Sequence, residues 1–165
     1  MTIDLKRIFV NDNSSLSIEY SLDLSSLEHM GDYPLKKPVL LKGTVSNKAS
    51  LVRLDATVFY EFEGPCDRCG ISFADNHSVS IEKSLATAIE GEESETIILV
   101  PDMKLNLDEL IYTEVVLSLS MKHLCDENCK GICFKCGKNL NEGDCNCPKK
   151  EIDPRLAALA ELLNN

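Results

Sequence analysis

The sequence contains no tryptophan and only three histidines, and aromatic residues make up 5% of its 165 positions. A buried core must therefore be built from leucine, isoleucine and valine. A run of about 18 consecutive apolar residues is also missing, which excludes a transmembrane helix at the level of sequence. The hydrophobic fraction of 44% is sufficient for one globular domain, or for one domain with a small appendage.

The N-terminus lacks the features of a secretory signal. Residues 1–7 include Asp4 and no long apolar stretch, whereas a signal peptide needs a continuous apolar segment. We therefore expect a soluble protein that stays in the reducing cytoplasm, where disulfides are rare.

Basic residues are too few to balance the acidic ones. The chain has 17 Lys and Arg against 27 Asp and Glu, which gives a formal net charge of −10. Nucleic-acid affinity comes largely from lysines and arginines that neutralise phosphates, so this composition disfavours tight, autonomous binding to RNA or DNA. It favours a basic protein partner, or a local basic patch that acts inside a larger assembly.

The first hundred residues have the alternation that is typical of β-strands. Apolar and polar side chains alternate without a break over residues 16–24, which predicts a half-buried strand. Further strands are predicted at residues 39–46, 52–62 and 79–85, with a short one at 96–100. Their short links predict an antiparallel sheet, arranged as a sandwich or an open barrel. The acidic run at residues 90–95 is interpreted as a solvated loop.

Helical signals are found in the second part of the chain. Asn106 and Glu109 form a capping-box pattern, which predicts that a helix begins there. Residues 115–121 fit either its continuation or a strand. Asp153 and Pro154 predict the start of a short C-terminal helix. The expected class is α+β, mostly β: a β domain at residues 1–100, then residues 101–165 with a helix, a cysteine cluster and a C-terminal helix packed on it.

Eight cysteines are the most informative feature of the sequence. Their spacing is Cys66-x₂-Cys69-Gly, Cys125-x₃-Cys129-x₃-Cys133-x₂-Cys136-Gly and Cys145-x-Cys147. In a Cys-x-x-Cys-Gly turn both sulfurs can bind one ion, and the glycine permits a positive φ that turns backbone N–H groups toward them. Because a reducing compartment disfavours disulfides, four close pairs of thiols predict two structural Cys₄ zinc sites.

The pairs can combine in more than one way. We prefer one site made of Cys66, Cys69, Cys125 and Cys129, and a second made of Cys133, Cys136, Cys145 and Cys147, because the second set closes a short loop at little cost in chain entropy. The main alternative joins the two Cys-x-x-Cys turns in zinc-ribbon style, and a single occupied site also remains open.

Other uses of the cysteines fit less well. A disulfide framework lacks its signal peptide, a thioredoxin-like pair lacks the surrounding βαβ unit, and the spacings match neither common ferredoxin run. Catalytic zinc keeps an open coordination position, whereas here the thiolates are numerous enough to close both sites. His29 and His77 are interpreted as surface residues and His123 as structural. We therefore expect no enzyme.

Three segments together resemble the YceD family, the large ribosomal RNA subunit accumulation proteins, in the Gram-positive form that has the full C-terminal cysteine set. These segments are Cys66-Asp67-Arg68-Cys69-Gly70, residues 129–141 (CKGICFKCGKNLN), and Cys145-Asn146-Cys147 with residues 153–159 (DPRLAAL). The resemblance implies a role in accumulation of large-subunit ribosomal RNA, and hence in ribosome biogenesis. Its implied partner is a ribosomal protein or a pre-ribosomal particle of the large subunit.

Two other functions remain open. One is a zinc- or redox-responsive regulator that releases metal when its thiols are oxidised. The other is an RNA-processing enzyme or its zinc subunit, although the sequence nominates no catalytic residue for it.

Overall fold

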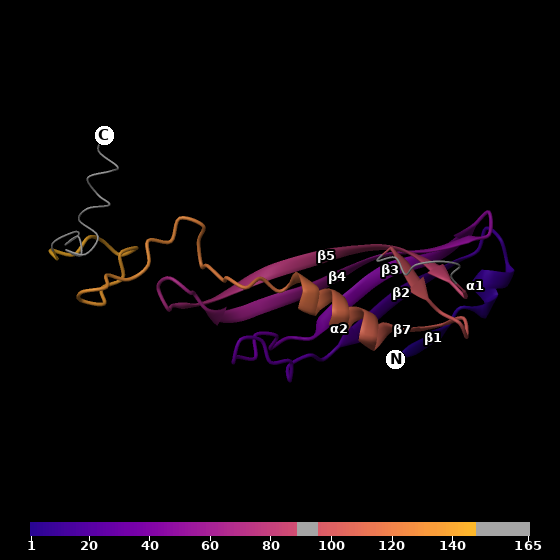
Figure 1. Cartoon of the computed structure of the whole chain (residues 1–165), viewed down its shortest axis with the longest axis horizontal. Coiled ribbons are helices and arrows are strands. Elements are labelled where there is room, and N and C mark those ends of the chain that lie inside the picture. The colour runs from indigo at the N-terminus through magenta and orange to yellow at the C-terminus, as the bar shows by residue number, and fades with distance from the viewer. Residues whose placement is uncertain (89–95, 148–165) are drawn as a thin grey trace, which may run out of the picture.

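The computed structural model describes residues 1–88 and 96–147, and it confirms the predicted α+β, mostly β class (Figure 1). Neither of the helices in these residues has the length and apolar character needed to cross a membrane. The acidic run at 90–95 and the C-terminal helix predicted from Asp153 lie outside the described residues. The elements in chain order are β1 (Thr2–Asp4), α1 (Lys6–Val10), β2 (Ser15–Leu22), β3 (Val39–Lys48), β4 (Leu51–Pro65), β5 (Ser72–Ala86), β6 (Ile97–Leu99), β7 (Lys104–Asn106) and α2 (Leu107–Ser118).

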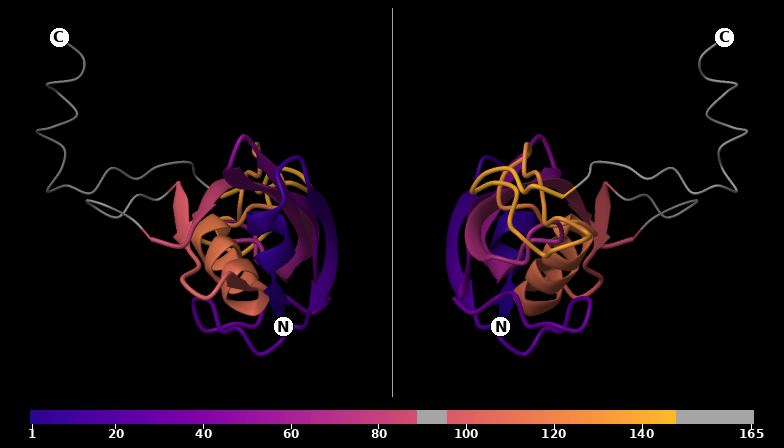
Figure 2. Two further views of the ribbon diagram at one scale, coloured as in Figure 1. Left: turned by 90° about the vertical axis from the view of Figure 1, so that its right-hand side faces the viewer. Right: turned by 90° about the vertical axis from the view of Figure 1, so that its left-hand side faces the viewer.

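The larger sheet has the strand order β2-β3-β4-β5-β6. Strands β2 to β5 are antiparallel neighbours, whereas the short β6 runs parallel to the end of β5. A second sheet is only a two-stranded antiparallel ribbon of β1 and β7. Figure 2 shows the larger sheet curling around α2. The described residues thus form one open, curved sheet, which is closer to the expected open barrel than to a sandwich of two large sheets.

One face of this sheet forms the core. Along β4, alternate residues are buried while those between them are exposed or half-buried, which is the period-two pattern that places one side of a strand inside. Helix α2 covers that face and buries its own apolar stripe in the same cluster, which completes a single continuous core. The buried residues of β4 and α2 are Val52, Leu54, Ala56, Val58, Tyr60, Phe62, Leu107, Leu110, Ile111 and Val115.

Helix α2 begins where its cap was predicted. The Asn106 side chain accepts a hydrogen bond from the Asp108 N–H at 3.2 Å and satisfies one of the unpaired donors of the first turn. Glu109 contacts the side-chain amide of Asn106 at 3.5 Å, so the reciprocal bond of a capping box to the backbone is replaced by a side-chain contact. The helix continues to Ser118, which settles the first part of the ambiguous segment as helix.

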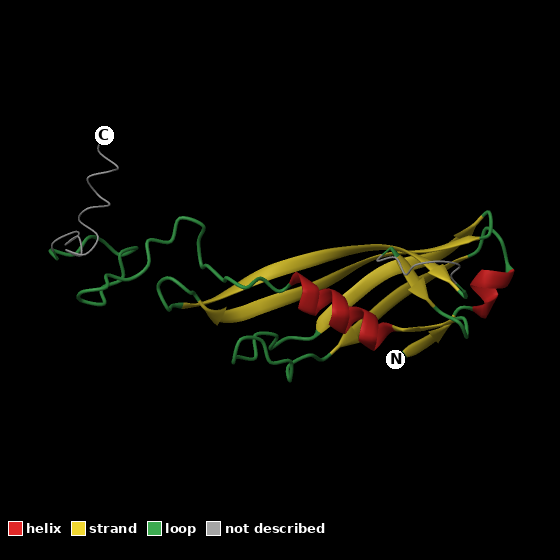
Figure 3. Ribbon diagram, viewed as in Figure 1, coloured by secondary structure: helices red, strands yellow, loops and turns green. Residues whose placement is uncertain are grey.

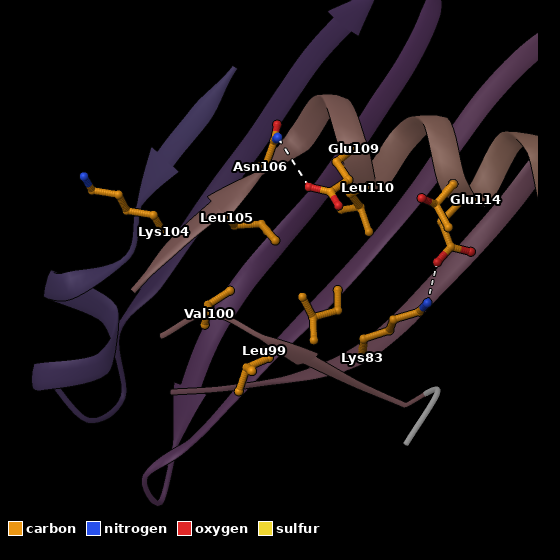
Figure 4. A pocket seen from close by; sticks show the side chains of 11 residues that line it. Lys83, Leu99, Val100, Lys104, Leu105, Asn106, Glu109, Leu110 and Glu114 are labelled. Atoms are coloured by element: carbon orange, nitrogen blue, oxygen red, sulfur yellow. Dashed lines mark hydrogen bonds and ion pairs between the residues drawn. The ribbon is translucent and has the colours of Figure 1, made fainter. Parts of the chain in front are cut away.

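An ion pair ties α2 to the sheet beside a surface hollow. The hollow has a volume of about 270 Å³ and lies between β6, β7 and α2. At one side the Lys83 ammonium of β5 and the Glu114 carboxylate of α2 point toward each other, 2.5 Å apart (Figure 4). Both side chains are mostly buried, so this pair fixes the position of the helix on β5.

Candidate metal centre

The long hairpin of β4 and β5 ends in the first Cys-x-x-Cys-Gly turn. The Gly70 N–H donates to the Cys66 carbonyl at 2.8 Å, and the Cys66 N–H donates to the Ile71 carbonyl at 2.9 Å. Gly70 has a φ of 73°, a conformation that glycine adopts without the steric cost that a Cβ would bring. These bonds close a tight loop at the end of the sheet.

The second Cys-x-x-Cys-Gly turn repeats the same local structure. The Gly137 N–H donates to the Cys133 carbonyl at 2.8 Å, the Cys133 N–H donates to the Lys138 carbonyl at 2.9 Å, and φ of Gly137 is again 73°. This turn lies in the segment after α2, which has turns and isolated bridges but neither helix nor strand over residues 119–147 (Figure 3). Its shape therefore depends on local hydrogen bonds and on the cysteines.

The eight sulfurs gather in two groups of four. The first group consists of Cys66, Cys69, Cys125 and Cys129, and the second of Cys133, Cys136, Cys145 and Cys147; within each group all sulfurs lie within 4.8 Å of one another. This is the division that the loop-closure argument preferred, and all eight cysteines are free thiols. Metal binding by either group remains a proposal.

The geometry of the first group fits a tetrahedral ion. The sulfurs of Cys66 and Cys129 are 3.8 Å apart, and those of Cys69 and Cys125 are 3.6 Å apart. A zinc ion with four bonds to sulfur of about 2.3 Å places neighbouring sulfurs about 3.8 Å apart. Two of the sulfur–sulfur separations are therefore close to those that such an ion requires, and all of them lie within 4.8 Å.

The pKa values of two thiols in the first group are shifted in opposite directions. Burial raises the pKa of the Cys66 thiol, but N–H groups of Cys125, Cys69 and Arg68 point at the sulfur, and together they lower its pKa to about 6. Burial, followed by hydrogen bonds to the neighbouring sulfurs, raises the pKa of Cys125 to about 12. Four thiolates so close together cannot all be charged at neutral pH unless a cation lies among them, and a dication would allow that.

The second group has the same contrast in a more exposed position. The backbone N–H groups of Cys136 and Lys135 lower the pKa of the Cys133 thiol to about 6. A hydrogen bond with Cys136, together with burial, raises the pKa of Cys147 to about 12. Cys136 is exposed and the other three are half-buried, whereas in the first group only Cys125 is not fully buried.

The two residues inside the first turn hold the following cysteines in place. The Asp67 N–H donates to the His123 carbonyl at 2.9 Å, and the His123 N–H donates to the Asp67 carboxylate at 2.6 Å. The Arg68 guanidinium donates to the carbonyl of Cys129 at 2.8 Å. The His123 ring stacks on Phe62 with centroids 3.7 Å apart and is not part of the sulfur group. Segment 123–132 is thus fastened to the hairpin by its backbone.

Asn141 connects the two groups. Its side-chain amide donates to the Cys129 sulfur at 3.2 Å, and its carbonyl oxygen accepts the Lys130 N–H at 2.8 Å. The Leu140 N–H also donates to the Gly131 carbonyl at 2.9 Å. Neither Asn141 nor Arg68 was predicted from the sequence to support the site. Arg68 could have been noticed because it lies inside a turn, whereas no spacing distinguishes Asn141 from the neighbouring asparagines.

Comparison with known proteins shows the family of the chain. The sequence profile of the family described as "Large ribosomal RNA subunit accumulation protein YceD" matches residues 54–163, which is more than half of the chain and includes all eight cysteines. The chain belongs to the YceD family. The resemblance inferred from the cysteine segments is thereby confirmed.

Three relatives of this YceD-family chain show how much of each protein is shared. It is 26% identical over 174 residues to the chloroplastic large ribosomal RNA subunit accumulation protein YCED homolog 1 of Arabidopsis thaliana, covering 86% of this chain and 54% of the relative. The homolog of the same name from Zea mays is 25% identical over 175 residues, with coverages of 86% and 59%. The uncharacterized protein YlbN of Bacillus subtilis is 27% identical over 155 residues, with coverages of 90% and 88%. The chain thus spans little more than half of the plant relatives, and no solved structure matches it.

Proposed function

We propose that this chain is a non-enzymatic zinc-binding factor that supports the accumulation of large-subunit ribosomal RNA, and hence ribosome biogenesis, in the cytoplasm. The observation that carries the proposal is the family match, which extends over both cysteine groups. The names of the two plant relatives refer to the same process.

The zinc part of the proposal rests on the donor set. Four thiols within 4.8 Å of one another suit a soft or borderline cation with tetrahedral coordination. The eight cysteines would hold two ions, and each ion would cross-link its segment and neutralise thiolates that otherwise repel each other. Four thiolates complete a tetrahedral shell and leave no position for a reacting water, which is why we propose a structural and not a catalytic role. Native mass spectrometry should find two zinc ions per chain.

The charge of the chain supports a basic partner. A net charge of −10 repels phosphate backbones and attracts cationic surfaces at ranges of about one Debye length, roughly 8 Å at physiological salt. We propose that the acidic surface of the chain binds a basic ribosomal protein or a pre-ribosomal particle of the large subunit.

Depletion of the protein in its host tests the function. Large-subunit and small-subunit ribosomal RNA are then compared on a sedimentation gradient. We expect a selective fall of the large-subunit species, restored by re-expression of the wild-type chain. Balanced subunits after depletion would refute the proposed role.

The exposure of the second sulfur group favours one alternative function, a redox-responsive regulator. Cys136 is exposed, so an oxidant reaches this group more readily than the first. Zinc release from the loaded protein is measured against peroxide concentration. Release at low micromolar peroxide would support the regulator, and retention of both ions under the same conditions would argue against it.

A further inference from the structure

The two Cys-x-x-Cys turns share one backbone structure but differ in what lies between their cysteines. In the first turn Asp67 and Arg68 are engaged within the fold, through His123 and the Cys129 carbonyl. In the second turn the residue at the place of Asp67 is Phe134, and its side chain is 103% exposed. The same scaffold therefore presents an aromatic ring to solvent.

Packing within the described residues does not explain this phenylalanine. It is the most exposed of the large apolar side chains in the described part of the chain, whereas Phe62, the aromatic residue beside the first turn, is 4% exposed. A rigid turn closed by two backbone hydrogen bonds holds the ring at its tip. An apolar ring kept fully in water by a fixed backbone is typical of a contact point for a partner.

Three lysines lie near this ring in the sequence, in a stretch that Glu127 and Glu142 flank on either side. Residues 128–141 include Lys130, Lys135 and Lys138 and contain no Asp or Glu, although the chain has a net charge of −10. The Lys138 ammonium donates to the backbone carbonyl of Asp144 at 2.9 Å, a contact that leaves its positive charge in place. Figure 1 shows the segment after α2, which contains the second sulfur group, extending beyond the hairpin end, far from α1 and most of the sheet.

We infer that Phe134 is a stacking platform for an unpaired base of RNA, with the lysines of residues 128–141 contacting the adjacent phosphates. An exposed aromatic ring with lysines near it is one way in which single-stranded RNA is bound without a deep pocket, because every base has a face on which a ring can stack. A base inside a duplex is already stacked and cannot reach the ring. This inference rests on the proposed function, since it names the part of the ribosomal assembly that the chain touches.

The proposed contact with RNA is small and therefore weak. One base stacked on one aromatic ring contributes about a ten-fold gain in affinity or more. Three lysines give a shallow dependence on salt, with a slope of roughly −2 in log affinity against log salt. The two surfaces then have separate roles. The acidic surface of the chain binds a basic protein, and the second Cys-x-x-Cys turn binds unpaired RNA in the same particle.

The absence of tryptophan from the chain allows a direct test. In the zinc-loaded full chain, Phe134→Trp introduces a single tryptophan at the turn, which can be excited selectively over the four tyrosines. It is titrated with a single-stranded RNA of about 12 nucleotides and with the same RNA annealed to its complement. We expect saturable quenching by the single strand and much less by the duplex. As a matched control, Phe59→Trp on the outer face of β4, where the native ring is 42% exposed, should not be quenched.

Affinity measurements complete the test. Binding of fluorescein-labelled RNA, followed by anisotropy, should weaken about ten-fold or more in Phe134→Ala and be retained in Phe134→Tyr, with zinc content and melting temperature unchanged in both. Equal RNA affinity of Phe134→Ala and wild type, or quenching by a purified large-subunit protein and not by RNA, would overturn the inference.

The two proposals fail in different ways. Selective loss of large-subunit RNA on depletion, together with unchanged RNA binding by Phe134→Ala, would refute the stacking site and leave the proposed function standing. Balanced subunits on depletion would refute the proposed function whatever the titration shows.

Discussion

At the scale of single residues, Cys66 and Cys133 are the first cysteines of the two turns, but their surroundings differ. Cys66 is 2% exposed at the end of the β4–β5 hairpin, whereas Cys133 is half-buried in a segment without regular structure. We expect Cys66→Ser to lose one metal ion and to lower the melting temperature, because metal binding there contributes to folding of the hairpin end. Cys133→Ser should lose one ion with little change in the melting temperature. Metal analysis and circular dichroism check both, and unchanged values for Cys66→Ser would contradict the prediction.

Asn141 offers a second test at this scale. Asn141→Asp keeps an oxygen to accept the Lys130 N–H but removes the donor to the Cys129 sulfur and adds a negative charge beside it. Groups that orient or stabilise ligands in this way change metal affinity by about 10- to 100-fold. We expect a loss of that size at the first group only, measured by competition with a chromophoric chelator. An unchanged affinity would show that this hydrogen bond does not support the site.

The residues that local sequence could identify are those whose chemistry is local. Cys-x-x-Cys-Gly spacing indicates both turns because two sulfurs and one positive φ lie within five residues. Asn141 and Arg68 act through contacts that are defined only after the chain has folded: Asn141 bonds to a sulfur 12 residues away and Arg68 to a carbonyl 61 residues away. The sequence gives the position of Phe134 between two cysteines, but its exposure is known only from the structure.

At the scale of elements, the register of β3 on β4 depends on one glycine. Gly43 lies opposite Ala56, and a Cβ at Gly43 would lie 2.3 Å from the Ala56 Cβ and 2.5 Å from its Cα. Because backbone has to move to relieve that overlap, Gly43→Ala should lower the free energy of unfolding by about 1–3 kcal/mol. Urea denaturation measures this. Ser46→Ala on the outer face of the same strand is the control and should change stability by less than about 0.5 kcal/mol.

Strands β2, β3, β4 and the second half of β5 were predicted from their alternation, and the short β6 from its apolar run. The first half of β5, from Ser72, lacks that alternation and was not predicted. Strands β1 and β7 have three residues each, and Thr2 pairs with Asn106. Such a pairing leaves no local periodicity. Helix α2 was ambiguous at its end because Val115 and Val116 also suit a strand, and burial of Val115 against the sheet favours the helix.

At the scale of the whole molecule, the two sulfur groups should lose metal at different rates. The first group is mostly buried and fastened to the sheet, whereas the second has an exposed cysteine and lies in irregular structure. We expect a chelator to remove one ion quickly with the far-ultraviolet spectrum unchanged, and the other slowly with loss of β structure. A metal indicator measures release of the ions while circular dichroism measures loss of β structure, and together they give the order. A single release phase, or loss of β structure in the fast phase, would contradict it.

The distance along the chain between cysteines of one group has a consequence for synthesis. The second group is contained in residues 133–147 and can capture its ion as soon as that short segment has left the ribosome. The first group joins residues 66–69 to residues 125–129 and must wait until the hairpin, β6, β7 and α2 have been made. During that interval Cys66 and Cys69 are thiols without their partners on a nascent chain. If both groups bind zinc as proposed, zinc supply acts at two points of translation, first when residues 125–129 emerge and then when residues 133–147 emerge. Scarcity at the first point leaves a hairpin with reactive ends.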